Sequence, residues 1–428
     1  MTRQKKSSRN PWAWVSTLYF AEGLPYVIVM SVSVIMYKRM GVSNTDIALY
    51  TSWLYLPYVI KPLWSPIVDI LKTKRFWIIA MQLLIGSSLA GIALTIPVPN
   101  YFQYTLAFFW LLAFSSATYD IAADGFYMLG LSKHDQAFFI GIRSTFYRIA
   151  MITGQGLLII IVGYLETTTA GNIPLSWTIT FSILAIFFAL IFIYHYFILP
   201  YPSEDRTEIS QNGNNIFSEF IKTFILFFKK KHILIFIAFL LFYRLGESQL
   251  VKLASPFLLD SKEAGGLGLT TSEVGFVYGT IGMLSLLAGG ILGGFLASRD
   301  GLKNWLWWMV AAINLPNSVY IYLSTAQPES FLLISACVAI EQFGYGFGFT
   351  AYMLYMIYIS DGQHKTAHFA ISTAFMALGM MIPGMSSGWL QEMLGYKLFF
   401  VWTVLATIPA FIIIKYIPLD AEFGCKNE

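Results

Sequence analysis

The chain has 428 residues, of which 57% are hydrophobic and only 12% are charged. A soluble domain typically carries about 25% charged residues, so this chain has too little polar surface to cover a water-soluble body. Its mean hydropathy of +0.64 indicates that lipid is its solvent. The net charge of +4 is small, and we find no basic patch interleaved with aromatic residues that would bind nucleic acid.

The apolar segments follow one another along the whole chain and predict an all-α membrane protein. A membrane-spanning helix needs about 20 mostly apolar residues. Basic Met1 to Arg9 leads into the first apolar segment without a small-residue cleavage site, so we expect that segment to be retained. Twelve spans are predicted, at residues 11–37, 44–70, 75–97, 102–130, 136–165, 174–199, 232–259, 272–298, 303–325, 330–359, 366–393 and 396–418.

One long connection, at residues 200–231, separates the spans into two groups of six. Its segment 216–231 is apolar on one side and ends in three lysines, which predicts an amphipathic helix at the membrane surface. We therefore expect five parts: a tail at 1–10, a six-helix bundle at 11–199, the central loop at 200–231, a second bundle at 232–418, and a tail at 419–428.

Basic residues predict the orientation, because cytoplasmic loops carry an excess of Lys and Arg. We assign about 18 of the 27 Lys and Arg residues to the side that holds both chain ends. About five lie on the other side, namely Lys38, Arg39, Lys252, Lys262 and Lys397. Both termini are therefore expected in the cytoplasm.

Ionisable residues inside the spans carry the functional signal. Such a group at mid-bilayer costs at least about 2.5–3.5 kcal/mol, so it normally faces a cavity or a partner. The set comprises Glu22, Lys61, Asp120, Asp124, Arg143, Arg148, Arg244, Glu247 and Glu341.

Two acids and two arginines face each other across the loop between the fourth and fifth spans. Asp120 and Asp124 are at i and i+4 and so share one helix face. Counting back from the loop sets Asp120 level with Arg148 and Asp124 level with Arg143, which predicts two rungs of ion pairs. The alternative is that these pairs only pin the two helices together, most plausibly for Asp124 and Arg143 near the water.

Spans one and seven hold equivalent positions in the two halves, and both carry charge beside glycine. Span one has Glu22 before Gly23, and span seven has Arg244 and Glu247 around Gly246. Their charges should therefore meet near the axis that relates the two halves. We expect these glycines either to loosen a cavity-lining helix or simply to permit close packing.

The remaining residues of the candidate site lie beside these charges. Span ten has Glu341 and Gln342, followed by alternating glycines that favour close helix packing over a nucleotide loop. Candidate proton-coupling residues are Glu22, Asp120, Asp124, Glu247 and Glu341. Candidate substrate-binding residues are Arg148, Arg244, Lys61, Gln342, Tyr19, Tyr26, Tyr119, Tyr147 and Tyr243. We find no metal-ligand cluster and no nucleophile–base pair, so we expect no metal, no cofactor and no enzymatic activity.

Two charged loops at matching places resemble the cytoplasmic loop motif of the major facilitator superfamily. The first holds Asp69, Lys74 and Arg75 after span two, and the second holds Arg299 and Lys303 after span eight. With Arg143, they are our candidate gating residues. The motif's expected role is to hold neighbouring helix ends together by ion pairs and helix-terminus charge; ordinary flanking charge is the alternative.

Several segments together resemble the AmpG-like muropeptide permeases, whose wider group includes acetyl-CoA and siderophore carriers. They are residues 22–26, 61–69, 115–124, 147–148, 243–247 and 341–342, and the likeness extends from about residue 14 to about 415. The chain departs from the family at Glu22, where a small residue is expected, and at Arg244 and Glu247, where Lys and Asp are expected.

The resemblance implies the major facilitator fold in a bacterial inner membrane. It also implies proton-driven import of N-acetylglucosaminyl-anhydromuramyl peptides or amino sugars from the periplasm to the cytoplasm by alternating access. In this mechanism a proton neutralises Glu22, Asp120 or Glu247 and frees Arg148 or Arg244 for a cargo carboxylate, which the planar guanidinium pairs bidentately. We expect a monomer whose partners are the small solute, protons and lipid. Import of another solute such as a siderophore, drug efflux, and a non-transporting receptor remain alternatives.

Overall fold

Helices form every regular element of the computed structural model. The structure describes residues 9–202, 205, 213–362, 364–420 and 423, and for 69–70, 133, 137, 213–220 and 366 it describes the backbone only. Within these ranges there is no β-strand, and the predicted all-α class is confirmed.

Nine helical runs among the described residues are long and apolar enough to cross a membrane. They are Pro11–Arg39, Lys74–Thr95, Tyr101–Gly130, His134–Thr168, Ile173–Ile198, Ile233–Leu259, Thr271–Asp300, Phe331–Ser360 and Ala367–Ile413. Five of these runs contain more than one helix, among them Ala367–Ile413, which joins two predicted spans. The other four comprise η1 (Pro11–Ala13), α1 (Val15–Val27), η2 (Ile28–Val32) and α2 (Ser33–Arg39); α7 (Lys133–Ile152), η3 (Thr153–Leu157) and α8 (Leu158–Thr168); α11 (Ile233–Phe242) and α12 (Leu245–Leu259); and α13 (Thr271–Val274), η5 (Gly275–Gly282) and α14 (Met283–Asp300).

The other predicted spans are present as broken or fused helices. The predicted span 44–70 is divided into α3 (Asn44–Trp53) and α4 (Leu56–Leu71), each too short to be counted alone. The predicted span 303–325 is divided into α15 (Leu302–Asn314), η6 (Leu315–Ser318) and α16 (Val319–Ala326). The last two predicted spans form α18 (Lys365–Leu405), kinked at Gly395 with φ 73°, followed by α19 (Ile408–Ile413). Two predicted spans are broken into helices too short to be counted, and two others are joined in one run, so the nine runs are consistent with twelve spans.

Helix contacts divide the chain into two compact units. Unit 1 comprises residues 1–29, 63–154 and 165–220, and unit 2 comprises 30–62, 155–164 and 221–428. The predicted division into bundles 11–199 and 232–418, with its two tails, stays a prediction.

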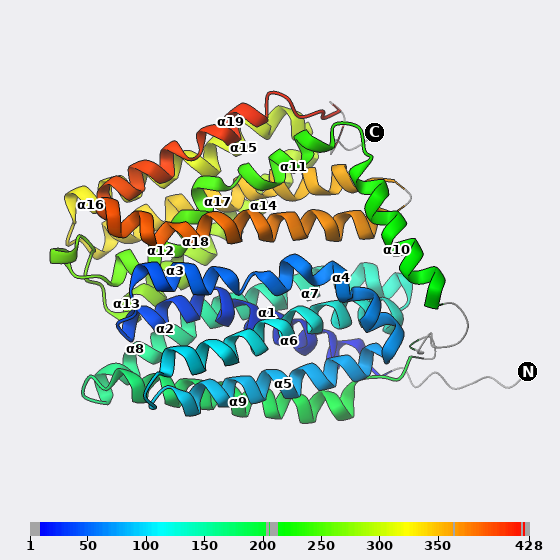
Figure 1. Ribbon diagram of the computed structural model, residues 1–428, viewed down its shortest axis with the longest axis horizontal. Coiled ribbons are helices and arrows are strands. Elements are labelled where there is room, and N and C mark those ends of the chain that lie inside the picture. The colour runs from blue at the N-terminus through cyan, green and yellow to red at the C-terminus, as the bar shows by residue number, and fades with distance from the viewer. Residues whose placement is uncertain (1–8, 203–204, 206–212, 363, 421–422, 424–428) are drawn as a thin grey trace, which may run out of the picture. The chain divides into compact units, whose positions relative to one another are not determined.

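In unit 1, α5 (Lys74–Thr95) packs along both α6 (Tyr101–Gly130) and α9 (Ile173–Ile198), while α1 packs along α7 (Figure 1). The α1–α7 crossing is close because Gly23 has no side chain. A Cβ atom there would lie 2.9 Å from the carbonyl oxygen of Tyr147. Gly23 therefore acts in packing, and α1 itself continues through Pro25 into the π-helical turn η2.

In unit 2, α17 (Phe331–Ser360) packs against α14 and α15, and α3 packs against α18. The glycines of α17 permit this contact. A Cβ atom at Gly346 would lie 1.9 Å from the carbonyl oxygen of Leu286, and one at Gly348 would lie 2.3 Å from that of Met309. The expected role of these glycines in close helix packing is confirmed.

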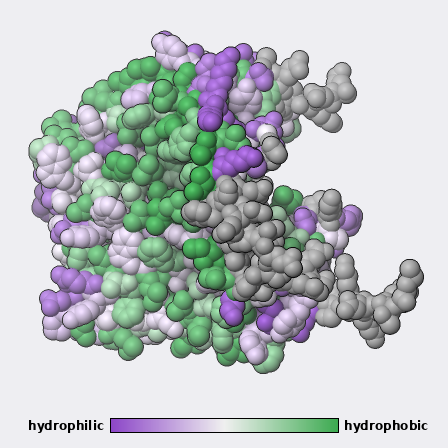
Figure 2. Space-filling model, turned by 45° about the vertical axis from the view of Figure 1, so that its right-hand side comes forward, coloured by the Kyte–Doolittle hydropathy of each residue, from purple (hydrophilic) through white to green (hydrophobic). Residues whose placement is uncertain are grey.

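Large apolar side chains remain exposed on many helices. Leu234 and Leu332 are each 79% exposed, and Leu94 and Ile291 are each 74% exposed. Apolar residues also cover much of the face shown in Figure 2. A soluble protein rarely exposes so much contiguous apolar surface, so this surface is suited to lipid.

The predicted helix of the central loop is present as α10 (Gly213–Phe228), and its place at the membrane surface stays a prediction. In its described second half, Thr223 and Phe227 are buried one turn apart, and Phe227 stacks on Phe375 of α18. Lys230, after α10, donates to the carbonyl oxygens of Ile359 and Asp361 at the end of α17. Partial burial lowers the pKa of Lys230, and the Asp361 carboxylate opposes that shift. One face of α10 is thereby fixed to unit 2.

Candidate transport site

The first cluster of predicted site residues joins three helices of unit 1. Arg143 on α7 pairs with Asp124 on α6, with 2.9 Å between Nη2 and Oδ1. The Tyr19 hydroxyl on α1 donates to the same carboxylate oxygen at 3.1 Å, and the Arg143 guanidinium lies 4.5 Å from the Tyr19 ring centre. The side chains of Arg143 and Asp124 are 29% and 43% exposed, so water screens this pair.

The predicted second rung, between Asp120 and Arg148, does not form. Arg148 is exposed and makes no ion pair with any residue that the structure describes. Helix geometry explains this difference. Asp120 and Asp124 are four residues apart and share a face, whereas five residues separate Arg143 from Arg148 and turn them about 140° apart around α7.

Glu22 lies in α1 beside the first cluster and is 7% exposed. Its carboxylate interacts electrostatically with Arg143 and with the hydroxyls of Tyr19 and Tyr119. The structure therefore brings Glu22, Tyr19, Asp124 and Arg143 together around α1.

The second cluster is in unit 2, where the helix breaks between α11 and α12. Arg244 is the residue before the first turn of α12, and its Nε donates to Oε2 of Glu247 at 2.9 Å. Its Nη2 donates to the hydroxyl of Tyr345 at 2.8 Å, and the guanidinium lies 4.9 Å from the Phe349 ring centre. The side chains of Arg244 and Glu247 are only 9% and 1% exposed, so this is a buried ion pair.

Gly246 allows α12 to approach α18. A Cβ atom at Gly246 would lie 2.4 Å from the carbonyl oxygen of Thr403. Of the two expectations for this glycine, close packing is the one that the structure shows. The break in the helix lies just before it, at Tyr243 and Arg244.

Glu341 of α17 is a second buried acid in unit 2, 2% exposed. Its carboxylate accepts hydrogen bonds from Nε2 of Gln342 at 3.0 and 3.3 Å and makes no ion pair with a described residue. It interacts electrostatically with Glu247 and with Tyr278 of η5. Two carboxyl groups, one guanidinium and several hydroxyls thus lie near each other in unit 2.

Two of the predicted binding tyrosines, Tyr119 and Tyr243, donate hydrogen bonds to the backbone of neighbouring helices, and their predicted roles stay predictions. The Tyr119 hydroxyl donates to the carbonyl oxygen of Leu18 at 3.0 Å, and the Tyr243 hydroxyl donates to that of Gly348 at 3.0 Å. Both residues are almost fully buried. Tyr26, Lys61 and Tyr147 are half-buried on α1, α4 and α7, and their predicted roles stay predictions.

Sequence reasoning missed a buried polar network centred on His195 of α9. This residue is fully buried. Its Nδ1 lies 2.6 Å from Nε2 of Gln82, and its Nε2 lies 2.8 Å from Oγ1 of Thr17. Gln82 Nε2 also donates to the Tyr119 hydroxyl at 3.1 Å. The network ties α1, α5, α6 and α9 together. The only sequence signal was an isolated histidine in an apolar span.

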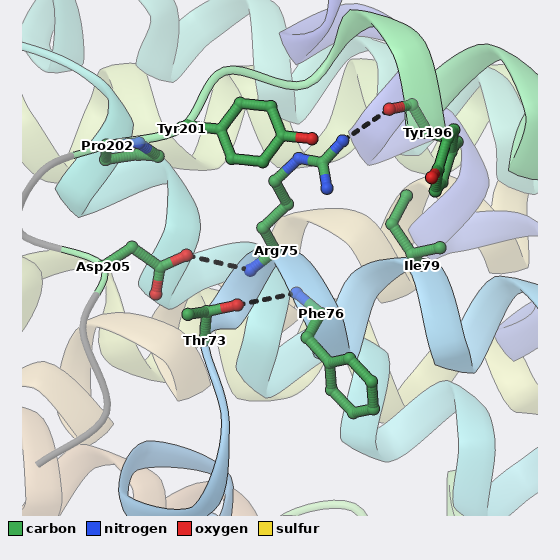
Figure 3. Close-up of a pocket in the computed structure, with 8 residues that line it drawn as sticks. All are labelled: Thr73, Arg75, Phe76, Ile79, Tyr196, Tyr201, Pro202 and Asp205. Carbon is green, nitrogen blue, oxygen red and sulfur yellow. Dashed lines mark hydrogen bonds between the residues drawn. The ribbon is translucent and has the colours of Figure 1, made fainter.

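The loop motif after span two contacts the central loop. Asp205 accepts hydrogen bonds from the backbone N–H groups of Lys74 and Arg75, at 2.7 and 3.1 Å, at the start of α5. Arg75 donates to the carbonyl oxygen of Tyr196 and lies 4.0 Å from the ring centre of Tyr201. Arg75, Asp205, Tyr196 and Tyr201 are among the residues that line a pocket of about 290 Å³ (Figure 3). The side chain of Asp69 lies outside the described residues.

The matching loop after span eight forms a local contact. Arg299 pairs with its neighbour Asp300, and Nε1 of Trp305 donates to the same carboxylate at 2.8 Å. Gly301 makes the turn with φ 84°. Lys303 is exposed and forms no ion pair within the described ranges. Each loop is therefore held by hydrogen bonds at a helix end.

Comparison with known proteins places this geometry in a family. The sequence model of the Major Facilitator Superfamily matches residues 15–359. A relative named putative transporter AmpG 4, from Rickettsia conorii, is 29% identical over 94% of each chain. The anhydromuropeptide permease of Escherichia coli K12 is 24% identical over 96% of this chain and 80% of its own length. The predicted AmpG-like resemblance is confirmed at this modest identity.

Solved structures show the same fold. A mutant of the nucleoside transporter NupG has a TM-score of 0.70 at 15% identity, covering 94% of this chain and 99% of its own. A D-xylose–proton symporter also has a TM-score of 0.70, at 14% identity, covering 95% of this chain and 97% of its own. The predicted major facilitator fold is confirmed.

Proposed function

The chain belongs to the major facilitator superfamily and is a membrane transporter, and we propose that it imports muropeptides from the periplasm to the cytoplasm by alternating access, driven by protons. The support for this cargo is the name of a relative that aligns over almost the whole chain, the E. coli anhydromuropeptide permease. Such cargo carries carboxylates. A proton-driven carrier can bind them with a cation that becomes free when its partner acid is protonated.

The buried Arg244–Glu247 pair carries the proposal. The guanidinium of Arg244 uses Nε for Glu247 and Nη2 for Tyr345, and its other N–H groups donate to no described residue. Oε1 of Glu247 is buried and accepts no hydrogen bond among the described residues. A buried pair that leaves polar atoms unsatisfied is poorly explained as a stabilising contact, because each such atom costs about 1–3 kcal/mol.

Protonation of Glu247 would couple the proton to the cargo. A neutral Glu247 no longer holds Arg244 by charge, and its O–H becomes a donor. Arg244 then pairs bidentately with a cargo carboxylate, for which its planar fork is suited. Glu341, a buried acid that is hydrogen-bonded only by Gln342 among the described residues, serves as the second proton-carrying group.

Proteoliposomes test this scheme. The purified protein is expected to accumulate labelled anhydromuropeptide under an inward proton gradient and to lose the accumulation when an uncoupler is added. Glu247→Gln mimics the protonated acid. We expect it to reduce gradient-driven accumulation at least tenfold while retaining cargo exchange between two equal pools, because exchange requires no net proton transfer.

Glu329→Gln provides a matched control. This substitution makes the same change from carboxyl to amide, but the side chain of Glu329 is 89% exposed and pairs with Lys262. It should transport like the wild type. Exchange of no muropeptide by the wild-type protein would remove the cargo assignment and favour another solute, drug efflux or a receptor role. Full accumulation by Glu247→Gln would remove the coupling assignment.

A further inference from the structure

Lys252 is a buried cation that the scheme above does not use. It lies in α12, about 12 Å along the helix axis from Arg244, and is 1% exposed. From the sequence it was assigned to the charges on the far side of the membrane, and that assignment stays a prediction. The structure encloses its side chain between α12, α3 and α18, all within unit 2.

Lys252 contacts no anion among the residues that the structure describes. Its Nζ donates to Oγ1 of Thr51 at 3.0 Å and lies 5.1 Å from the ring centre of Tyr55. These are its polar and ring contacts among the described residues, and none is a carboxylate. On the α18 side, its stem passes Gly384, where a Cβ atom would lie 3.4 Å from Cγ of Lys252. A lysine is rarely buried in this way unless it pairs with a charge or has a functional role.

A ring of hydrogen bonds holds α3 over Lys252. Lys38 pairs with Asp260 at 2.6 Å and donates to Oδ1 of Asn44 at 2.8 Å. The Tyr396 hydroxyl donates to Asp260 at 2.7 Å and accepts from Nδ2 of Asn44 at 2.9 Å. We call these four residues the Lys38 ring. Asn44 begins α3, Asp260 follows α12, and Tyr396 belongs to α18, so the ring closes over the three helices that enclose Lys252.

The hydrogen bonds and the ion pair of the Lys38 ring can be replaced by hydrogen bonds to water. The Lys38–Asp260 side chains are 14% and 19% exposed, so water reaches the ring from outside. If the ring opens and α3 moves away from α12 and α18, the amine of Lys252 becomes accessible on the same helix as Arg244. An amine left without an anion in the closed state is then available for one carried by a ligand.

We propose that Lys252 is a binding residue for a carboxylate of the cargo, reached when the Lys38 ring opens. The inference rests on the proposed transport function and adds a second cation, separate from Arg244, to cargo recognition. The alternative role for the amine is structural, as a donor that fixes α3 to α12 through Thr51. The two roles are separable, because loss of a structural contact would change KM for any cargo, whereas loss of a carboxylate site would change it only for a cargo with carboxylates.

Exchange assays with two probes test the proposal. One probe is an anhydromuropeptide with free peptide carboxylates, and the other is the same molecule with those carboxylates converted to amides. For the acid probe we expect Lys252→Gln to raise KM at least tenfold and Lys252→Arg to stay within about threefold of wild type, since one charged hydrogen bond contributes about 1.5–3 kcal/mol. For the amide probe, wild type and Lys252→Gln should have equal KM values.

The matched control is Lys397→Gln, which removes the charge of an exposed lysine and should leave both KM values unchanged. An equal rise in KM for both probes in Lys252→Gln, or no rise for the acid probe, would overturn the proposal.

If the wild-type protein exchanges neither probe, the muropeptide assignment fails, and Lys252 is judged by thermal stabilisation with lactate and lactamide. Stabilisation of the wild type by lactate alone, absent in Lys252→Gln, supports the carboxylate site. Equal responses to the two compounds, or an unchanged response in Lys252→Gln, reject it.

Discussion

The Arg143–Asp124 pair of unit 1 and the Arg244–Glu247 pair of unit 2 join the same chemical groups at the same distance of 2.9 Å. They differ in exposure. Water reaches Arg143 and Asp124, whose side chains are 29% and 43% exposed, whereas those of Arg244 and Glu247 are 9% and 1% exposed. An exposed pair contributes about 0–1 kcal/mol, while breaking a buried pair costs about 3–5 kcal/mol.

The comparison shows that a shared ion-pair geometry does not give a shared role. In unit 1 the pair connects α6 to α7 near water and is supported by Tyr19 of α1. In unit 2 the buried pair leaves Oε1 of Glu247 without a hydrogen bond among the described residues, so we expect the charge state of Glu247 to matter more than the contact itself. We therefore expect variants of the second pair to change transport and stability most.

The largest effect should come from Arg244→Gln. This change leaves Glu247 buried without its cation, and we expect about 3–5 kcal/mol of lost stability. Thermal unfolding of the purified protein in detergent, followed by tryptophan fluorescence, measures it. Adding Glu247→Gln should restore most of the stability but not the transport. If Arg244→Gln alone were as stable as the wild type, the buried pair would contribute no more to stability than the exposed Arg143–Asp124 pair.

Gly246→Ala should have an intermediate effect. The added Cβ would lie 2.4 Å from a backbone oxygen of Thr403, which cannot rotate away. Overpacking of this kind costs about 1–3 kcal/mol and would displace the start of α12, where Arg244 is anchored.

Gly294→Ala is the matched control for that experiment, because a Cβ atom there meets nothing within 4 Å. We expect its unfolding midpoint to stay close to that of the wild type. If the two alanine variants unfold at the same temperature, the close approach of α12 to α18 does not require a glycine at position 246.

The smallest effect should come from Asp124→Asn. Solvent already screens its charge, and the amide oxygen still accepts from Tyr19, so we expect a loss of about 0–1 kcal/mol and gradient-driven uptake within about threefold of wild type. The same unfolding and uptake assays apply. Loss of uptake as large as that of Glu247→Gln would return Asp124 to the proton-coupling set.

Composition and hydropathy alone determined the membrane environment, the all-α class and the positions of the spans. Motif residues alone indicated the family. These properties depend on local features, namely apolar length and residue identity, that need no knowledge of neighbours. The pair between Asp124 and Arg143 was also predictable, because a tight loop fixes the register of two adjacent helices.

Tertiary structure decided what each buried charge contacts. Arg148 was set level with Asp120 by counting along the chain, but rotation around α7 separates them. Lys252 was grouped from the sequence with the charges of the far side, and only the tertiary structure shows that α3 and α18 enclose its side chain. Burial and pairing depend on helix rotation and on segments far apart in sequence, and neither is encoded in local hydropathy.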